Sequence, residues 1–82
     1  MKATVIVELK SSVLDPQGKA IQHSLGSLGF DGVEDVRVGK LFRLTLADRG
    51  QSRDEIEAEL RNMCERLLAN TVIEHFSYTL EE

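Results

Sequence analysis

One segment, Val13-Leu14-Asp15-Pro16-Gln17-Gly18-Lys19-Ala20-Ile21, changes the hydrophobic period of this chain from two residues to a helical spacing. Asp15 suits the N-cap of a helix, where its carboxylate accepts backbone N–H bonds, and Pro16 suits the first helical position, which needs no N–H donor. Gly18 costs roughly 1 kcal/mol relative to alanine in a helix, and Lys19 places positive charge at the positive end of the helix dipole. Gly18 and Lys19 are thus unfavourable for the helix although they follow a good cap, which indicates that this segment is a contact surface.

The residues on either side of this segment predict a strand and a helix. Residues 3–9 alternate between two faces, and the apolar face consists of Ala3, Val5, Val7 and Leu9. The helical stripe that follows Pro16 consists of Ile21, Leu25 and Leu28. Gly29 predicts the end of this helix, with Phe30 folding back onto the last turn.

Two further strands are predicted at residues 33–38 and 41–47. Their apolar residues of one parity are Val36, Val38, Phe42, Leu44 and Leu46. A two-residue turn at Gly39-Lys40 would place opposite parities on one face, because side chains alternate along a strand. We therefore predict an odd-length loop or a bulge at Gly39, and favour the bulge.

A capping box predicts the second helix. Ser52-Arg53-Asp54-Glu55 pairs an N-cap serine with a glutamate three residues later. The predicted buried stripe that follows consists of Ile56, Leu60, Met63 and Leu67. The helix should stop near Asn70, and the apolar parity of the last strand consists of Val72, Phe76, Tyr78 and Leu80.

The predicted order is β-α-β-β-α-β in a single domain, residues 1–82. Two crossover units around one hairpin indicate the α+β class, a ferredoxin-like antiparallel sheet with two helices on one face. The opposite face would carry Ile6, Leu41 and Ile73, which is too apolar for a face left wholly in water. We expect a second copy or a partner to cover it.

Composition narrows the possible functions. A chain of 82 residues with one cysteine has a small core and no intramolecular disulfide, so oligomerisation is the natural source of further burial. The net charge of −4 argues against a general nucleic-acid binder. The chain shows neither a signal-peptide layout nor an apolar run of about 20 residues, which predicts a cytoplasmic protein without a membrane span.

No set of nucleophile, base and orienting group can be assembled. Cys64 is expected to be a packed thiol, His23 an exposed helical residue and His75 a residue of the sheet surface, and their spacing does not match a metal site. The basic residues Arg37, Lys40 and Arg43 would surround the predicted hairpin. They form either ordinary solvated charge or a small patch for a carboxylate, a phosphate or an acidic partner.

Three segments carry a resemblance to a known family. They are residues 13–21, Val36-Arg37-Val38-Gly39-Lys40, and Leu67-Leu68-Ala69-Asn70-Thr71-Val72-Ile73-Glu74. Together they resemble the signatures of PurS, the small subunit of phosphoribosylformylglycinamidine synthase (FGAM synthase), and the resemblance covers essentially the whole chain. Thr71 stands where the family usually has proline, and Ser11-Ser12 stands where it often has proline and glycine.

The resemblance implies a subunit of an ATP-dependent C–N ligase complex that has no active site of its own. In that complex a glutaminase subunit (PurQ) releases ammonia from glutamine, and a synthetase subunit (PurL) uses ATP and Mg²⁺ to convert formylglycinamide ribonucleotide to the amidine in purine biosynthesis. The small subunit would be a non-catalytic scaffold, a homodimer or homotetramer that binds no cofactor, metal, nucleic acid or membrane itself.

The expected partner-binding residues lie on three segments. They are Asp15, Gln17, Gly18, Lys19, Arg37, Gly39, Lys40 and Asn70. Functional residues are common on loops held by a rigid scaffold, so we expect alanine at Lys19 and Arg37 to weaken assembly without unfolding the protein. Two alternatives stay open: a ligand-sensing domain of the ACT type, which has the same element order, and a standalone enzyme with a site at a dimer interface.

Overall fold

The computed structural model describes residues 1–82, and its centre is a three-stranded antiparallel sheet. Strand β1 (Lys2–Leu9) lies between β2 (Gly39–Thr45) and β3 (Glu74–Glu81). Val5 in the middle of β1 is opposite Phe42 of β2 and Tyr78 of β3. Because side chains alternate along a strand, these apolar residues share one face. The alternation predicted for β1 is confirmed.

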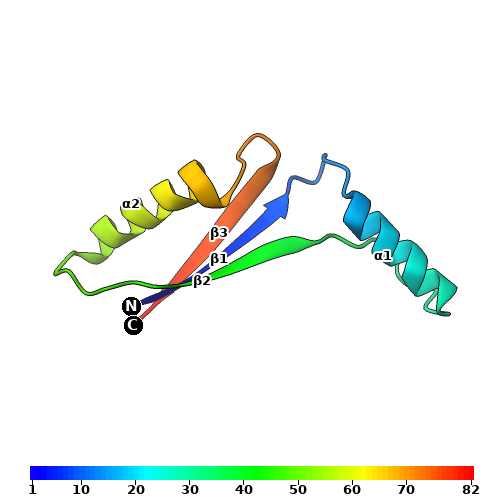
Figure 1. Ribbon diagram of the computed structural model, residues 1–82, viewed down its shortest axis with the longest axis horizontal. Coiled ribbons are helices and arrows are strands. Elements are labelled where there is room, and N and C mark those ends of the chain that lie inside the picture. The colour runs from blue at the N-terminus through cyan, green and yellow to red at the C-terminus, as the bar shows by residue number, and fades with distance from the viewer.

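Helix α2 (Arg53–Met63) lies along this apolar face of the sheet (Figure 1). It begins after Ser52, whose Oγ accepts a hydrogen bond from the backbone N–H of Glu55 at 3.2 Å, as the capping box predicts. The helix continues into a π-helical turn, η1 (Cys64–Leu68). The buried apolar core between α2, η1 and the sheet consists of Ala3, Val5, Val7, Leu60, Cys64 and Ala69.

The π-helical turn changes which side chains face the sheet. In η1 the N–H of Ala69 bonds the carbonyl of Cys64 at 2.8 Å, five residues earlier, so the helical register shifts by one residue. Cys64 is completely buried and Leu68 packs against the core, whereas Leu67 is 84% exposed. The prediction of a packed Cys64 is confirmed, and the prediction that Leu67 continues the buried stripe is wrong.

Helix α1 (Pro16–Ser27) lies beyond one end of the sheet instead of on its face (Figure 1). No residue of α1 belongs to the core or packs against it. The placement of both helices on one face is therefore wrong, and the molecule is elongated, 53 × 26 × 15 Å. The predicted C-terminus of α1 is confirmed, because Gly29 has φ 97° and the N–H of Phe30 returns to the carbonyl of Leu25 at 2.9 Å.

The predicted hairpin at Gly39 does not exist. Residues 33–38 form no strand, and Gly39 is the first residue of β2, opposite Glu8. The N–H of Val38 bonds the side chain of Asp15, and carbonyls of residues 33 and 34 accept bonds from Gln22. Since side chains satisfy this backbone, the segment does not pair as a strand, and the order is β-α-β-α-β.

The last strand also starts later than its apolar parity suggested. Asn70 accepts backbone bonds from Ile73 at 3.0 Å and Glu74 at 2.7 Å, which closes a turn before β3. Val72 lies in this turn and is 80% exposed, so its assignment to the strand is wrong. None of the helices has both the length and the apolar character that a membrane crossing requires.

Candidate partner-binding site

Asp15 forms the centre of the contact between α1 and the rest of the chain. Its Oδ1 accepts the N–H of Gly18 at 2.9 Å, which caps α1, and its Oδ2 accepts the N–H of Val38 at 2.8 Å. The residue is 4% exposed. The N–H groups of Val38 and Gly18 lower the pKa of this carboxyl, and the charge of Arg37 lowers it further. The carboxylate therefore stays ionised and holds two segments 23 residues apart.

Arg37 holds the segment that leads into α1. Its Nη2 donates to the carbonyl of Lys10 at 3.0 Å and to the carbonyl of Val13 at 2.8 Å. These bonds join the residues between β1 and α1 to the residues that lead into β2. The side chain is thus engaged within the chain, together with Asp15 and Gly18. We call these three residues the clasp.

Glycine is required at two of the predicted positions because backbones approach closely there. A Cβ on Gly18 would overlap the carbonyl oxygen of Val36, and a Cβ on Gly39 would lie 2.9 Å from the carbonyl oxygen of Val7. Neither glycine has a positive φ, so the reason is space and not backbone conformation. The unfavourable glycine in the first turn of α1 thus has a packing explanation.

The basic residues expected around a hairpin do not form one cluster. Lys40 and Arg43 lie three residues apart in β2, so they point to opposite faces of the sheet. Lys40 forms a 3.7 Å ion pair with Glu74 of β3, on the far side of β1. Arg37 belongs to the clasp. Of the two alternatives drawn from the sequence, the one that gathers all three cations in a single basic patch is therefore wrong.

The structure brings together several, but not all, of the expected site residues. Asp15, Gln17, Gly39 and Lys40 line one cavity of about 190 Å³ beside the clasp. Lys19 is exposed on α1 and lines a different hollow. Asn70 lies in the turn before β3, where its Oδ1 accepts the N–H of Val72 at 3.2 Å.

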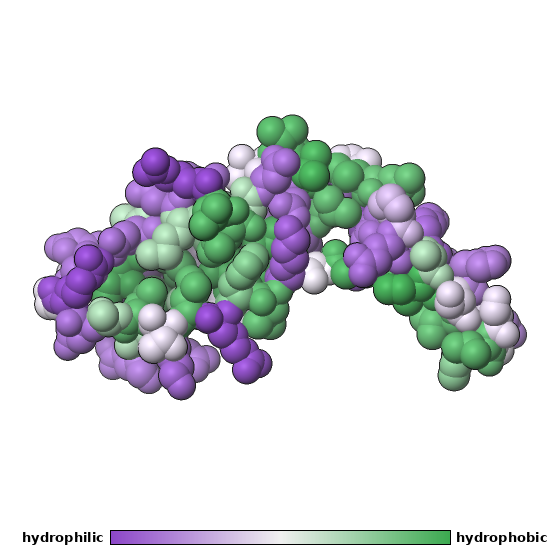
Figure 2. Space-filling view, viewed as in Figure 1, coloured by the Kyte–Doolittle hydropathy of each residue, from purple (hydrophilic) through white to green (hydrophobic).

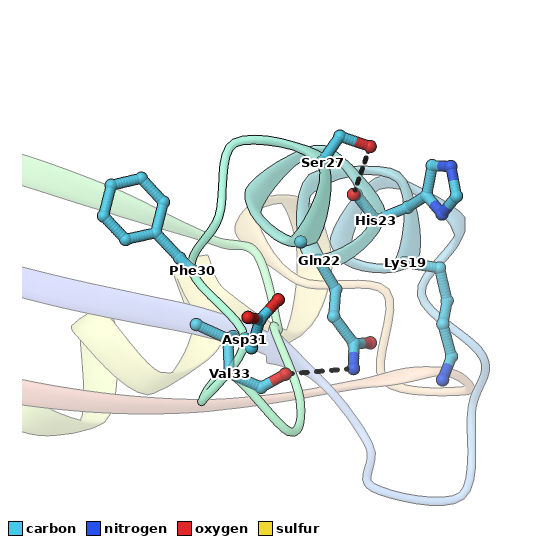
Figure 3. A pocket seen from close by; sticks show the side chains of 8 residues that line it. Lys19, Gln22, His23, Ser27, Phe30, Asp31 and Val33 are labelled. Atoms are coloured by element: carbon cyan, nitrogen blue, oxygen red, sulfur yellow. Dashed lines mark hydrogen bonds between the residues drawn. The ribbon is translucent and has the colours of Figure 1, made fainter.

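The second hollow is an open trough of about 660 Å³ beside α1 that sequence reasoning missed. Figure 3 shows Lys19 and His23 on the helix, and Phe30 and Asp31 on the loop that follows it. Gln22 fixes this loop by donating to the carbonyls of Val33 at 3.4 Å and Glu34 at 2.8 Å. An isolated helical glutamine has no sequence signal for this role. His23 is exposed, as predicted.

Apolar side chains remain uncovered on several surfaces (Figure 2). On α1 and its C-terminal turn, Ile21 is 39%, Leu28 73% and Phe30 59% exposed. On the sheet face opposite α2, Ile6 and Leu41 are cross-strand neighbours, 40% and 55% exposed. His75 is exposed on that face, as predicted. No three His, Cys, Asp or Glu side chains converge as metal ligands would.

These features define the class: a small α+β interaction protein with a thin sheet, a projecting helix and unshared apolar surface. The chain belongs to the PurS family, described as phosphoribosylformylglycinamidine (FGAM) synthase, whose model matches residues 2–82. Members of this family are subunits of FGAM synthase, a ligase of purine biosynthesis.

Two relatives match this chain over nearly the whole length of both proteins. The PurS subunit of Bacillus subtilis is 49% identical over 99% of this chain and 93% of its own, and that of Archaeoglobus fulgidus is 45% identical over 100% of both. The solved structure of B. subtilis PurS superposes with a TM-score of 0.86 over 99% of this chain and 98% of its own. A chain of the PurLQS structure from Thermotoga maritima, 27% identical, reaches 0.83 over 95% and 93%.

Proposed function

We propose that this chain is the non-catalytic scaffold of FGAM synthase and joins the glutaminase subunit to the ATP-dependent synthetase subunit. Glutamine would bind the glutaminase, and ATP and Mg²⁺ would bind the synthetase, all in the cytoplasm. The proposal is supported by family membership and by the PurLQS assembly of the T. maritima relative. Ammonia loses its nucleophilicity when protonated in water, so a scaffold that keeps two active sites joined would act through proximity.

The observation that carries the proposal is the projecting helix α1. Ile21 and Leu28 of its apolar stripe are exposed and Leu25 is half-buried, although the clasp ties α1 to the residues that lead into β2. An apolar surface of this kind on a small domain is typical of an interaction site. The exposed polar residues Gln17 and Lys19 lie at the base of the same helix.

We further propose that two copies associate through α1. In the chain alone, α2 covers the apolar face over β1, while Phe42 and Leu44 of the edge strand β2 remain partly exposed. The apolar stripe of α1 from a second copy would pack on Phe42 and Leu44 of β2. Self-association would also supply the burial that a chain of 82 residues lacks.

The decisive experiment reconstitutes the reaction from three purified proteins of one organism. We expect glutamine-dependent amidine formation to require this chain together with the synthetase and the glutaminase. A matched assay supplies ammonium chloride in place of glutamine. There the synthetase should work without this chain, because a scaffold is not needed when ammonia comes from solution. Loss of the ammonium-driven reaction without this chain would contradict a purely scaffolding role.

A further inference from the structure

We propose that the clasp (Asp15, Gly18 and Arg37) fixes the direction of α1 independently of the hydrophobic core, and so controls assembly. The inference rests on the proposed function, because α1 is the surface that the proposal assigns to association. It differs from a direct partner contact: these three residues act from inside the chain, by holding the helix that presents the contact.

The core does not hold α1. None of its residues lies in the core, and the hydrogen bonds that tie α1 and its cap to other parts of the chain all end in residues 33–38. That segment is itself held to the end of β1 by Arg37. A few polar contacts therefore replace the helix–sheet packing that usually sets the direction of a helix.

The geometry of these contacts leaves little freedom. A single carboxylate accepts two N–H groups, one from α1 and one from the approach to β2, and charge-assisted bonds of this kind are short and directional. Gly18 allows the helix to touch the backbone of Val36. The absence of a side chain at that one position lets both bonds form at once.

The length of α1 amplifies any change at the clasp. Twelve residues span about 18 Å. A tilt of about 20° at the base would therefore move the far end of the helix by about 6 Å. Leu25 and Leu28 lie toward that end, so their stripe would miss a partner surface while the sheet and α2 stayed unchanged.

The test compares Gly18→Ala with Gly26→Ala on the same helix. A Cβ at Gly18 meets the carbonyl of Val36, whereas a Cβ at Gly26 meets nothing within 4 Å. We expect Gly18→Ala to speed amide hydrogen exchange of Val38 by about tenfold or more. We also expect it to change the residual dipolar couplings of α1 relative to β1 and to raise the dissociation constant of the oligomer about tenfold or more. Gly26→Ala should do none of these.

The three readouts separate the clasp from the proposed function. Wild-type exchange at Val38, unchanged couplings of α1, or equal loss of protection throughout β1 and α2 in Gly18→Ala would overturn the clasp. A wild-type protein that is monomeric and binds neither partner would overturn the proposed function, while Val38 exchange would still decide the clasp. If Gly18→Ala does not fold, Asp15→Asn makes the same test. Asparagine caps a helix as well as aspartate, but it carries an NH2 donor in place of one of the two oxygens that accept N–H bonds here.

Discussion

The carboxylate of Asp15 accepts the backbone N–H of Val38 at 2.8 Å, which joins the start of α1 to the entry of β2. The same side chain caps α1 through Gly18. Asp15 thus has a local role, the cap of α1, which its position before Pro16 predicts. It also has a long-range role, the bond to Val38, which lies 23 residues away in the sequence.

Stability should depend on the ionisation of Asp15. Its pKa in the folded chain lies below the ordinary value of 3.8, because N–H groups favour the charged form. A depressed pKa contributes stability above the unfolded value, and that contribution is lost as the pH falls through the folded value. We expect Asp15→Asn to melt lower than wild type at about pH 7, and the gap to close below about pH 4. Thermal melts across pH measure it. Asp31→Asn, at an exposed position, should show no such gap.

The small core should depend strongly on Leu60. Its side chain is completely buried between α2 and the sheet, so Leu60→Ala removes apolar contacts and leaves a cavity. We expect a loss of about 2–5 kcal/mol in the free energy of unfolding, measured in urea. Leu67→Ala makes the same chemical change at a side chain 84% exposed and should cost about 0.5 kcal/mol or less. Equal losses would contradict the register shift of the π-helical turn.

Lys19 and Arg37 should separate partner binding from folding. The side chain of Lys19 makes no hydrogen bond or ion pair, so Lys19→Ala should stay within about 0.5 kcal/mol of wild-type stability. It should still weaken capture of the synthetase and glutaminase in a pull-down. Arg37→Ala removes bonds to Lys10 and Val13 and should cost about 1 kcal/mol. This differs from the expectation drawn from sequence alone. Intact assembly with Lys19→Ala would remove this residue from the site.

A charge on the apolar stripe of α1 should dissociate the proposed oligomer. Ile21→Glu would bury a carboxylate against a second copy, which is costly unless it is paired. We expect a smaller sedimenting species with unchanged far-ultraviolet circular dichroism, since Ile21 makes no core contact in its own chain. His23→Glu, on the opposite side of the helix, should keep the oligomer. Dissociation by both variants would point to charge and not to the stripe.

Cys64 should react with thiol reagents only when the chain unfolds. Burial raises the pKa of its thiol, and the nearby charge of Glu65 raises it further. The thiolate is the reactive form, so both its access and its population are reduced in the folded state. We expect colour development with a disulfide reagent at about pH 8 to follow urea unfolding. Above the ordinary thiol pKa the unfolded state gains by deprotonation, so folding should weaken as the pH rises there. Rapid labelling in buffer would contradict the packing of η1.

The local elements could be predicted from sequence because their signals are local. Alternation defined β1, Asp15 and Pro16 marked the start of α1, Gly29 marked its end, and Ser52 marked the start of α2. The family was also readable, because three short segments carry its pattern. Errors arose at residues 33–38 and at Leu67. The valines of residues 33–38 have a strand-like pattern, but side chains of Gln22 and Asp15 bond the backbone of this segment. Leu67 lies in a π-helical turn, which has no recognisable sequence signal.

The sequence by itself determined where each helix is capped, which faces of α2 and β1 are apolar, and to which family the chain belongs. Those properties depend on residues within a few positions of one another. Only the tertiary structure decided that α1 lies beyond the end of the sheet, that Gly18 lets α1 approach the backbone of Val36, and that Asp15 and Arg37 bind within the chain. The reason is physical: a carboxylate, a guanidinium and a glycine have the same chemistry whether they meet a partner or a distant part of their own backbone. Only their neighbours in space distinguish the two.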